Sequence, residues 1–223
     1  MTIRHHPHEE TLLAYAAGTM MPALSALVAC HLALCPRCRA EVRRMEMIGG
    51  ALLDQAREAG LSGKAVGGAL SRLPQASPEA GRSEPETGAR PRPSRQGVLP
   101  GPMTRHLGMD IEDIPWKELA PGVEQFKIKM PRRGGDLRLL RVQAGRKLLR
   151  HGHYGSELTL VLKGAYRDET GEYHAGEVAD LDEDIEHRPR VTDDGECICI
   201  IAGERHPRYK SLSLRLLRPF YGY

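Results

Sequence analysis

The chain is poor in aromatic residues and has no long apolar run. Only 4% of its 223 residues are aromatic, so any core has to be built from aliphatic side chains. No apolar stretch approaches the ~20 residues that a membrane-spanning helix needs. The first residues also lack the apolar segment of a secretory signal peptide. We therefore expect a cytoplasmic protein without a membrane partner.

The chain has little net charge and few cysteines. The formal net charge is only +3 and no long Lys/Arg run occurs, so we expect no direct contact with nucleic acid. The chain has five cysteines, an odd number that does not suit a disulfide framework. Cys35 and Cys38 lie close to His31, and this spacing favours metal ligation under reducing conditions.

Three segments of different character divide the chain. Residues 1–73 have helical periodicity and no clear strand. Residues 74–102 hold seven of the sixteen prolines, together with Gly, Ser, Arg and Glu, which predicts a flexible linker. Residues 103–223 contain short β-type runs separated by Gly and Asp/Glu turns, a pattern typical of a sandwich or barrel. The length suits two modest domains.

Prolines and glycines mark the helices of the first segment. Pro7 suits the start of a helix that runs to about Ala17, and Pro22 and Pro36 suit the starts of two more. Gly49–Gly50 is expected to weaken the third helix. A fourth amphipathic piece near the end of the segment is too short to be stable alone, so we expect it to dock on a partner. The apolar residues expected to meet that partner are Leu61, Val66, Leu70 and Leu73.

The first candidate metal site combines imidazole with sulfur. His31 and Cys35 are four residues apart and share one face of a helix, and Cys38 follows the turn that Pro36 enforces. Zinc prefers such nitrogen and sulfur donors, and a structural zinc site has four ligands. The candidates for the fourth ligand are His5, His6 and His8.

Other interpretations of these cysteines carry less weight. Cys35 and Cys38 could be small buried apolar residues, and His31 a core histidine. A thioredoxin-like redox pair is disfavoured because no βαβ pattern surrounds it. Cys30 is expected to face away from this corner and to serve in packing.

The second candidate site has imidazole and carboxylate donors. The spacing is Gly145-x5-His151-x-His153-x3-Glu157-x6-Gly164. Residues two apart on a strand face the same way, so His151 and His153 are expected to point into the barrel together. Glu157 follows on the next strand, and His187 arrives from a distant one. Three His and one Glu bind zinc, iron, manganese or nickel, and the residues do not choose among these metals.

These motifs resemble a known family. The spacing around His151, His153 and Glu157 is similar to the first cupin motif, and Gly176 and His187 are similar to the second. The His31-x3-Cys35-x2-Cys38 pattern resembles the signature of zinc-binding anti-sigma domains. The two patterns in this order resemble the ChrR family of anti-sigma factors over nearly the whole chain.

The resemblance implies both a fold and a function. It implies an α+β multidomain chain, with a small zinc-stapled helical bundle (1–73), a Pro-rich linker (74–102) and a cupin β-barrel of jelly-roll type (103–223). The helical domain would clamp an extracytoplasmic-function sigma factor in a 1:1 complex. The cupin would help release that factor under singlet oxygen or related oxidative stress.

The resemblance also implies metal ligands. In the family, the N-terminal histidine that completes the zinc site matches His6. The metal ligands expected from motif and resemblance together are His6, His31, Cys35, Cys38, His151, His153, Glu157 and His187. Zinc is expected in the first site, and zinc or another divalent transition metal in the second.

Two alternatives remain at this point. A cupin with these ligands is also competent as a metal-dependent dioxygenase or isomerase, or as a metal sensor or storage protein. No catalytic residue is expected, because no obvious acid/base pair accompanies the motif. The acidic residues that follow it are interpreted as a solvated turn: Asp180, Asp182, Glu183, Asp184 and Glu186.

Overall fold

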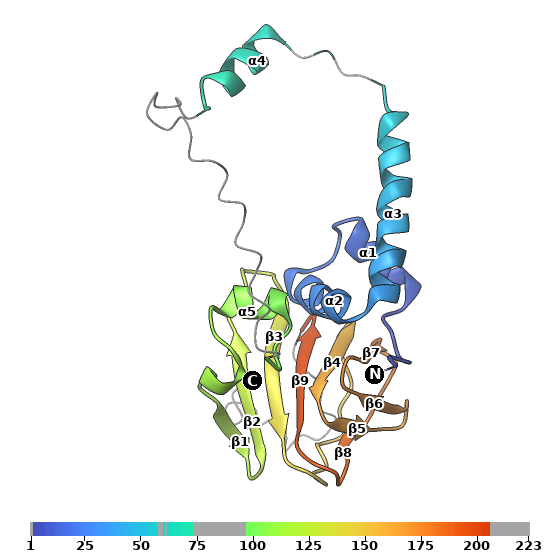
Figure 1. The fold of residues 1–223 in the computed structure, drawn as a ribbon, viewed down its shortest axis with the longest axis vertical. Coiled ribbons are helices and arrows are strands. Elements are labelled where there is room, and N and C mark those ends of the chain that lie inside the picture. Colours follow the sequence, from blue (N-terminus) through green and yellow to red (C-terminus); the bar gives the residue numbers. More distant parts are fainter. Residues whose placement is uncertain (1, 58–59, 61, 74–96, 206–223) are drawn as a thin grey trace.

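Helices stacked on two β-sheets form the body of the protein (Figure 1). The computed structural model describes residues 2–57, 60, 62–73 and 97–205. Most of the Pro-rich segment and Leu61 therefore lie outside the described residues. The helices are α1 (Glu9–Ala16), α2 (Pro22–Leu34), α3 (Pro36–Asp54), α4 (Gly63–Leu70) and α5 (Gly101–Leu107), with a 3-10 turn, η2, at Ile111–Asp113.

Helix boundaries largely follow the proline and glycine signals. Helices α2 and α3 begin at Pro22 and Pro36, as predicted. Helix α1 begins two residues after Pro7, and Gly18 follows its end with a φ of 68°. Helix α3 passes through Gly49–Gly50 without a break, so the two glycines do not end it. Because the proline ring disfavours a helical residue before it, Cys35 is extended and separates α2 from α3.

Two sheets make up the cupin part. The large sheet has the order β1-β2-β3-β9-β4-β7, and the small sheet has the order β6-β5-β8. The strands are β1 (Lys117–Ala120), β2 (Val123–Ile128), β3 (Asp136–Val142), β4 (Glu157–Lys163), β5 (Ala165–Arg167), β6 (Glu172–His174), β7 (Val178–Leu181), β8 (Arg190–Val191) and β9 (Cys197–Gly203). Hydrogen bonds do not join the two sheets into one closed barrel. The strands nevertheless have the arrangement of a cupin jelly roll, as expected.

The central strands of the large sheet are buried on both faces. In β4, Leu158 and Leu160 belong to the core that the helices share, whereas Val161 belongs to the core between the two sheets. In β9, Ile198 and Ile200 likewise face the helices, and Cys197 and Cys199 face the small sheet. Side chains alternate along a strand, so burial on both faces requires an unbroken apolar run.

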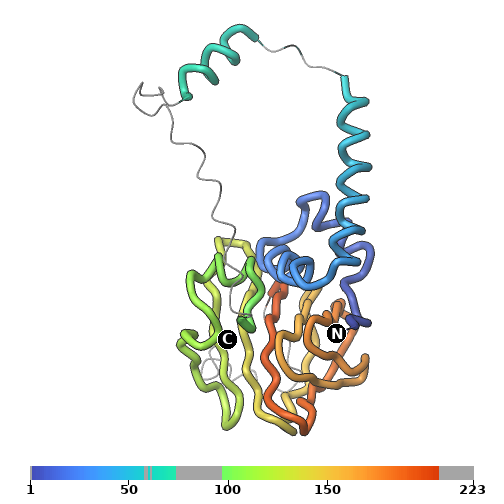
Figure 2. Tube along the Cα trace, in the orientation of Figure 1, coloured from blue at the N-terminus to red at the C-terminus, as the bar shows by residue number. Residues whose placement is uncertain are grey.

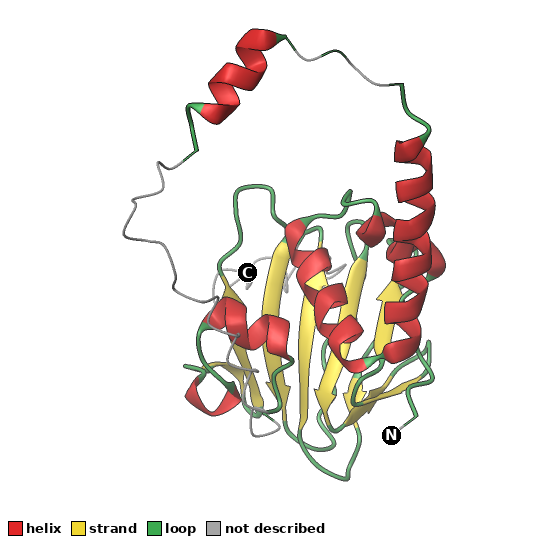
Figure 3. Cartoon of the chain, turned by 45° about the horizontal axis from the view of Figure 1, so that its top comes forward, coloured by secondary structure: helices red, strands yellow, loops and turns green. Residues whose placement is uncertain are grey.

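Helices α2 and α5 cover the outer face of the large sheet (Figure 3). Leu24, Leu27 and Val28 of α2 are buried in the same apolar cluster as Leu139 of β3. The backbone N–H of Ala23 donates a hydrogen bond to the carbonyl oxygen of Gly134, 2.8 Å away. The helical part and the cupin therefore pack directly on each other. The division at 73 and 103 stays a prediction.

Helices α3 and α4 extend away from this body (Figure 1). Only the first half of α3 contributes buried residues, Cys38 and Val42, and α4 has no buried residue. Large apolar side chains on both helices are exposed, among them Leu52 at 66% and Leu70 at 62%. Within the described ranges, no helix combines the length and the apolar character that spanning a membrane requires.

Candidate metal centres

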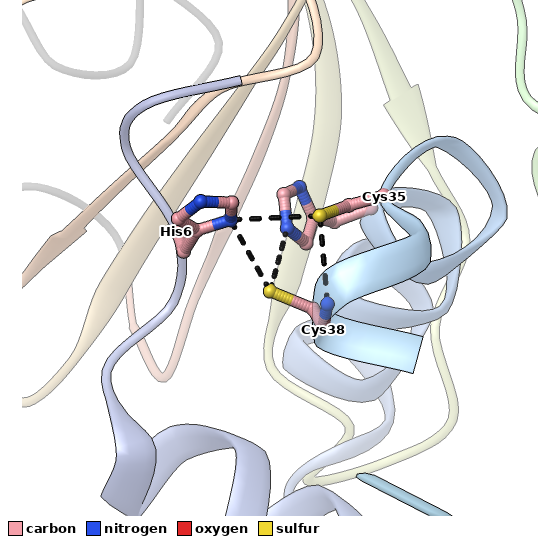
Figure 4. Close-up of side chains that lie close together, drawn as sticks. His6, Cys35 and Cys38 are labelled. Carbon is pink, nitrogen blue, oxygen red and sulfur yellow. Dashed lines mark hydrogen bonds between the residues drawn. The ribbon is translucent and has the colours of Figure 1, made fainter. Parts of the chain in front are cut away.

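The first predicted set of ligands comes together at the junction of α1, α2 and α3. We call it the N-terminal group: His6, His31, Cys35 and Cys38. One donor atom from each residue lies within 4.8 Å of all the others. His6 comes from the segment before α1, His31 from the last turn of α2, and Cys35 and Cys38 from the corner into α3 (Figure 4).

Short distances within the N-terminal group show that the side chains converge. His6 Nδ1 lies 3.3 Å from Cys38 Sγ and 3.5 Å from Cys35 Sγ. His31 Nε2 lies 3.3 Å from Cys38 Sγ. His6 is therefore the candidate for the fourth ligand that meets the other three. His5 and His8 instead lie near carboxylates of the cupin.

Burial makes this group unfavourable without a cation. Burial and then the neighbouring Cys35 raise the pKa of the Cys38 thiol to about 12. Burial also lowers the pKa of His31 to about 4, so its ring is neutral at pH 7. A divalent cation among the donors would stabilise the thiolates that burial disfavours. Two sulfur and two imidazole donors fit a closed tetrahedral zinc site.

The cupin part supplies a contact that sequence reasoning missed. His31 Nδ1 donates a hydrogen bond to the carbonyl oxygen of Gly176, 3.0 Å away. This bond fixes the tautomer, so Nε2 is the nitrogen left to face the group. No sequence signal could have paired these residues, because they are 145 positions apart. Cys30 is also buried, and burial raises the pKa of its thiol to about 12, as suits a packing residue.

The second predicted set converges between the two sheets. We call it the cupin group: His151, His153, Glu157 and His187, whose donor atoms lie within 4.8 Å of one another. His151 Nε2 is 3.2 Å from His187 Nε2 and 3.9 Å from Glu157 Oε1. Their spacing predicted that His151 and His153 lie on one strand, but neither belongs to a regular strand. His151 instead forms an isolated antiparallel bridge with His187.

Two observations fit a metal ion in the cupin group. Both ring nitrogens of His153 are buried and lack an aligned hydrogen-bond partner among the described residues, although Nδ1 lies 3.3 Å from Glu157 Oε2. Burial alone would raise the pKa of Glu157, but the adjacent His151 and His153 rings outweigh it and hold that pKa well below its usual range. The carboxylate is therefore ionised and able to bind a cation.

Asp168 is a further residue of this site. Its Oδ2 accepts a hydrogen bond of 2.7 Å from Nδ1 of His187, which leaves Nε2 of that ring directed at the cupin group. Burial raises the pKa of Asp168, but the bonds from His187 and Thr170 outweigh this effect and lower it overall. The sequence indicated only a turn here, because an Asp before Thr-Gly is also an ordinary turn residue.

A small cavity of ≈ 40 Å³ adjoins the cupin group. Tyr166, Cys197 and Cys199 line it together with His151, Glu157 and His187. The Tyr166 hydroxyl is buried and has no hydrogen-bond partner in the described part of the chain. Sites for drug-sized molecules are about 300–1,000 Å³. This cavity therefore has room for a molecule of a few atoms and not for a sugar phosphate.

One acidic residue differs from its predicted role. Asp180 was expected in a solvated turn, but it belongs to β7 and its side chain is only 7% exposed. It accepts hydrogen bonds from the helical part of the chain. The expectation was wrong because β7 extends to Leu181, so the first residue of the acidic run still belongs to the strand.

Helices with a His/Cys group, followed by a cupin-like double sheet with a His/Glu group, define a two-part cupin protein. The family model described as "ChrR Cupin-like domain" matches residues 104–205. The anti-sigma-E factor ChrR of Cereibacter sphaeroides is 37% identical, over 99% of this chain and 99% of its own. This chain therefore belongs to the ChrR family of anti-sigma factors, a family of regulators rather than enzymes.

A solved structure agrees with this assignment. The crystal structure of Rhodobacter sphaeroides SigE in complex with the anti-sigma ChrR matches with a TM-score of 0.72 and 35% identity. The match covers 91% of this chain and 100% of the other. The resemblance inferred from the motifs and the expected fold class are thereby confirmed.

Proposed function

We propose that this chain binds an extracytoplasmic-function sigma factor in a 1:1 complex and keeps it from RNA polymerase. The observation that carries the proposal is whole-length similarity to an anti-sigma-E factor and to a ChrR chain in complex with SigE. The apolar side chains exposed on α3 and α4 support it, because such a patch suits a protein partner. The predicted cytoplasmic location belongs to the proposal, since sigma factors act with RNA polymerase there.

The N-terminal group is proposed to hold zinc. His6, His31, Cys35 and Cys38 would bind the ion, which would join the segment before α1 to the corner between α2 and α3. Zinc in a closed site contributes folding free energy and no chemistry. In this role the ion keeps α1 to α3 in the arrangement that presents their apolar side chains to the sigma factor.

The cupin group is proposed to serve the response to singlet oxygen or related oxidative stress. His151, His153, Glu157 and His187 would hold zinc or another divalent transition metal, which would supply Lewis acidity to a small bound molecule. The buried Tyr166 hydroxyl can donate a hydrogen bond to that molecule, and the apolar cavity wall excludes bulk water. Binding or reaction of that molecule at the cupin group would then weaken the affinity of the chain for the sigma factor.

Removing the two thiols of the N-terminal group tests the first half of this proposal. In the full chain, Cys35→Ala/Cys38→Ala should lose one equivalent of metal and should no longer bind the cognate sigma factor. Metal analysis and titration with the purified sigma factor measure the two losses. Cys30→Ala is the matched control, because this buried cysteine lies outside the group. Retained sigma binding by the metal-depleted double variant would argue against the role of zinc.

A further inference from the structure

The segment before α1 lies along strand β7 of the cupin, beside it in the trace (Figure 2). The backbone N–H of Val178 donates to the carbonyl oxygen of His5, 3.2 Å away. The Glu177 carboxylate accepts a hydrogen bond of 2.7 Å from the Arg4 backbone N–H and one of 3.0 Å from His5 Nδ1. It also accepts a bond of 3.0 Å from the His174 N–H of its own hairpin. Glu177 is only 2% exposed, so its bonds are shielded from water.

A second carboxylate, Asp180 of β7, holds the start of α1. Oδ2 of Asp180 accepts a bond of 2.8 Å from the His8 backbone N–H and one of 2.7 Å from the Thr11 hydroxyl. His8 is the N-cap of α1 and makes no side-chain cap bond, and Asp180 satisfies its backbone N–H, which has no partner within the helix. His6 thus lies between two anchored points, one at Glu177 and one at Asp180.

The turn before β7 contacts His31 directly and also contacts Ile3, which precedes His6 in the chain. Gly176 accepts the bond from His31 Nδ1 described above. Gly176 has a φ of 88°, and a Cβ there would lie 3.1 Å from Cδ1 of Ile3. Ile3 therefore packs closely on a turn that needs glycine for its backbone conformation. His31 is fixed through its own ring, and His6 through the chain on either side of it.

We propose that β7 and its preceding turn form a positioning surface for the N-terminal group, with Glu177 and Asp180 as its positioning residues. We call this surface, Gly176 to Asp180, the β7 clasp. The cupin thereby completes the outer shell of a site whose four donors all come from the helical part. The proposal rests on the proposed function in one respect, the assignment of zinc to the N-terminal group.

The same strand also borders the cupin group. Strand β7 pairs with β4, and this register places Leu181 opposite Glu157 and Asp180 opposite Leu158. Glu157 is a residue of the cupin group, so β4 and β7 connect the two groups through one pair of strands. A movement of β7 that accompanied a change at Glu157 would displace the acceptors that hold residues 4–11. The β7 clasp therefore gives the cupin a direct physical route to the N-terminal group.

Reactivity of the two thiols tests the β7 clasp in the full-length, zinc-loaded protein. Zinc-bound thiolates resist alkylation, so the rates at Cys35 and Cys38 with iodoacetamide, followed by peptide mass spectrometry, report on this group alone. Glu177→Gln keeps the side-chain shape but places an amide donor against N–H donors. We expect alkylation about 10-fold faster, because Glu177 acts on His6 only through the chain and loss of a partner bonded directly to a ligand weakens metal binding by about 10–100-fold.

A second variant keeps the test independent of damage to the cupin. Thr11→Val removes only the hydroxyl that binds Asp180, from the helical side, and should also raise the rate. Glu196→Gln is the matched control, because this carboxylate pairs with Lys163 on the exposed surface. If Glu177→Gln unfolds the cupin, as seen by circular dichroism, the Thr11→Val rate decides the question.

The outcomes separate two failures. If Glu177→Gln keeps a folded cupin and is alkylated at the wild-type rate, the β7 clasp is overturned and the zinc site stays in place. If Glu177→Gln unfolds the cupin, a wild-type rate in Thr11→Val has the same meaning. Equal rates for the zinc-loaded wild-type chain and for the same chain stripped of metal by a chelator overturn the zinc assignment itself, and the clasp with it. Faster alkylation in the clasp variants and not in Glu196→Gln supports the proposal.

Discussion

At the scale of single residues, Asp168 sets the orientation of the His187 ring in the cupin group. Its carboxylate accepts the Nδ1 proton of His187, and both side chains are almost fully buried, at 0% and 2% exposure. We expect Asp168→Asn to weaken metal binding at the cupin group by about 10–100-fold, because an amide no longer fixes the ring or raises its basicity. Competition with a chelator of known affinity measures the change.

The Asp168→Asn variant needs a control of equal chemistry. Asp194→Asn makes the same change at an exposed position and should leave metal affinity unaltered. The N-terminal group should also keep its metal in both variants, as judged by the reactivity of Cys35 and Cys38. Equal cupin-metal affinity in Asp168→Asn and the wild type would show that His187 needs no such partner.

The members of the two candidate groups were predictable from sequence, and the residues that support them were not. His31, Cys35 and Cys38 are neighbours along the chain, so helical geometry and Pro36 already bring them together. Gly176, Asp168 and Glu177 lie in turns beside distant strands, and the type of each residue did not indicate its contact. Their positions depend on strand register, which a single sequence does not determine.

At the scale of elements, α2 and the large sheet share one core. Leu27 is fully buried in it, so Leu27→Ala should lower the free energy of unfolding by about 2–5 kcal/mol. Because the core is shared, we expect helices and cupin to lose stability together in a thermal melt followed by circular dichroism. Leu13→Ala, at a position 54% exposed, is the control and should change stability by less than about 0.5 kcal/mol.

A separate melting step would contradict the shared core. If Leu27→Ala produced an early transition of the helices and left the cupin transition unchanged, the two parts would be energetically independent. The sequence predicted the apolar strands and helices α1 to α4, but it did not predict α5. It could not reveal that they pack on each other, because an unbroken apolar strand such as Cys197–Ile201 reads the same whatever covers its second face.

The projecting half of α3 is the element best suited to bind the sigma factor. Its apolar side chains are mostly exposed, including Leu52 at 66% and Leu53 at 74%. Leu52→Glu/Leu53→Glu should weaken sigma binding by about 10–100-fold, because a charge buried in an apolar interface is costly. Calorimetric titration measures the affinity. Leu149→Glu on the cupin, 47% exposed, is the control, and an equal loss there would remove the assignment of this surface.

At the scale of the whole molecule, the proposed function assigns inhibition to the N-terminal group and response to the cupin group. The N-terminal group lies at the base of α3, whereas the cupin group lies between the two sheets, and β7 borders both. Emptying the cupin group should therefore leave the apolar surface of α3 and α4 intact. It should at the same time remove the group that is proposed to respond to oxidative stress.

The variant His151→Ala/His153→Ala tests this division, because it removes two of four donors. We expect it to repress a sigma-dependent reporter as the wild type does, and to show no induction when cells are exposed to singlet oxygen from light and a photosensitiser. His106→Ala, at an exposed position of α5, is the control and should induce normally. Full induction in the double variant would remove the sensing role from the cupin group. Loss of repression without stress would instead show that the group supports the grip on the sigma factor, and faster alkylation of Cys35 and Cys38 in that variant would trace this effect to the N-terminal group.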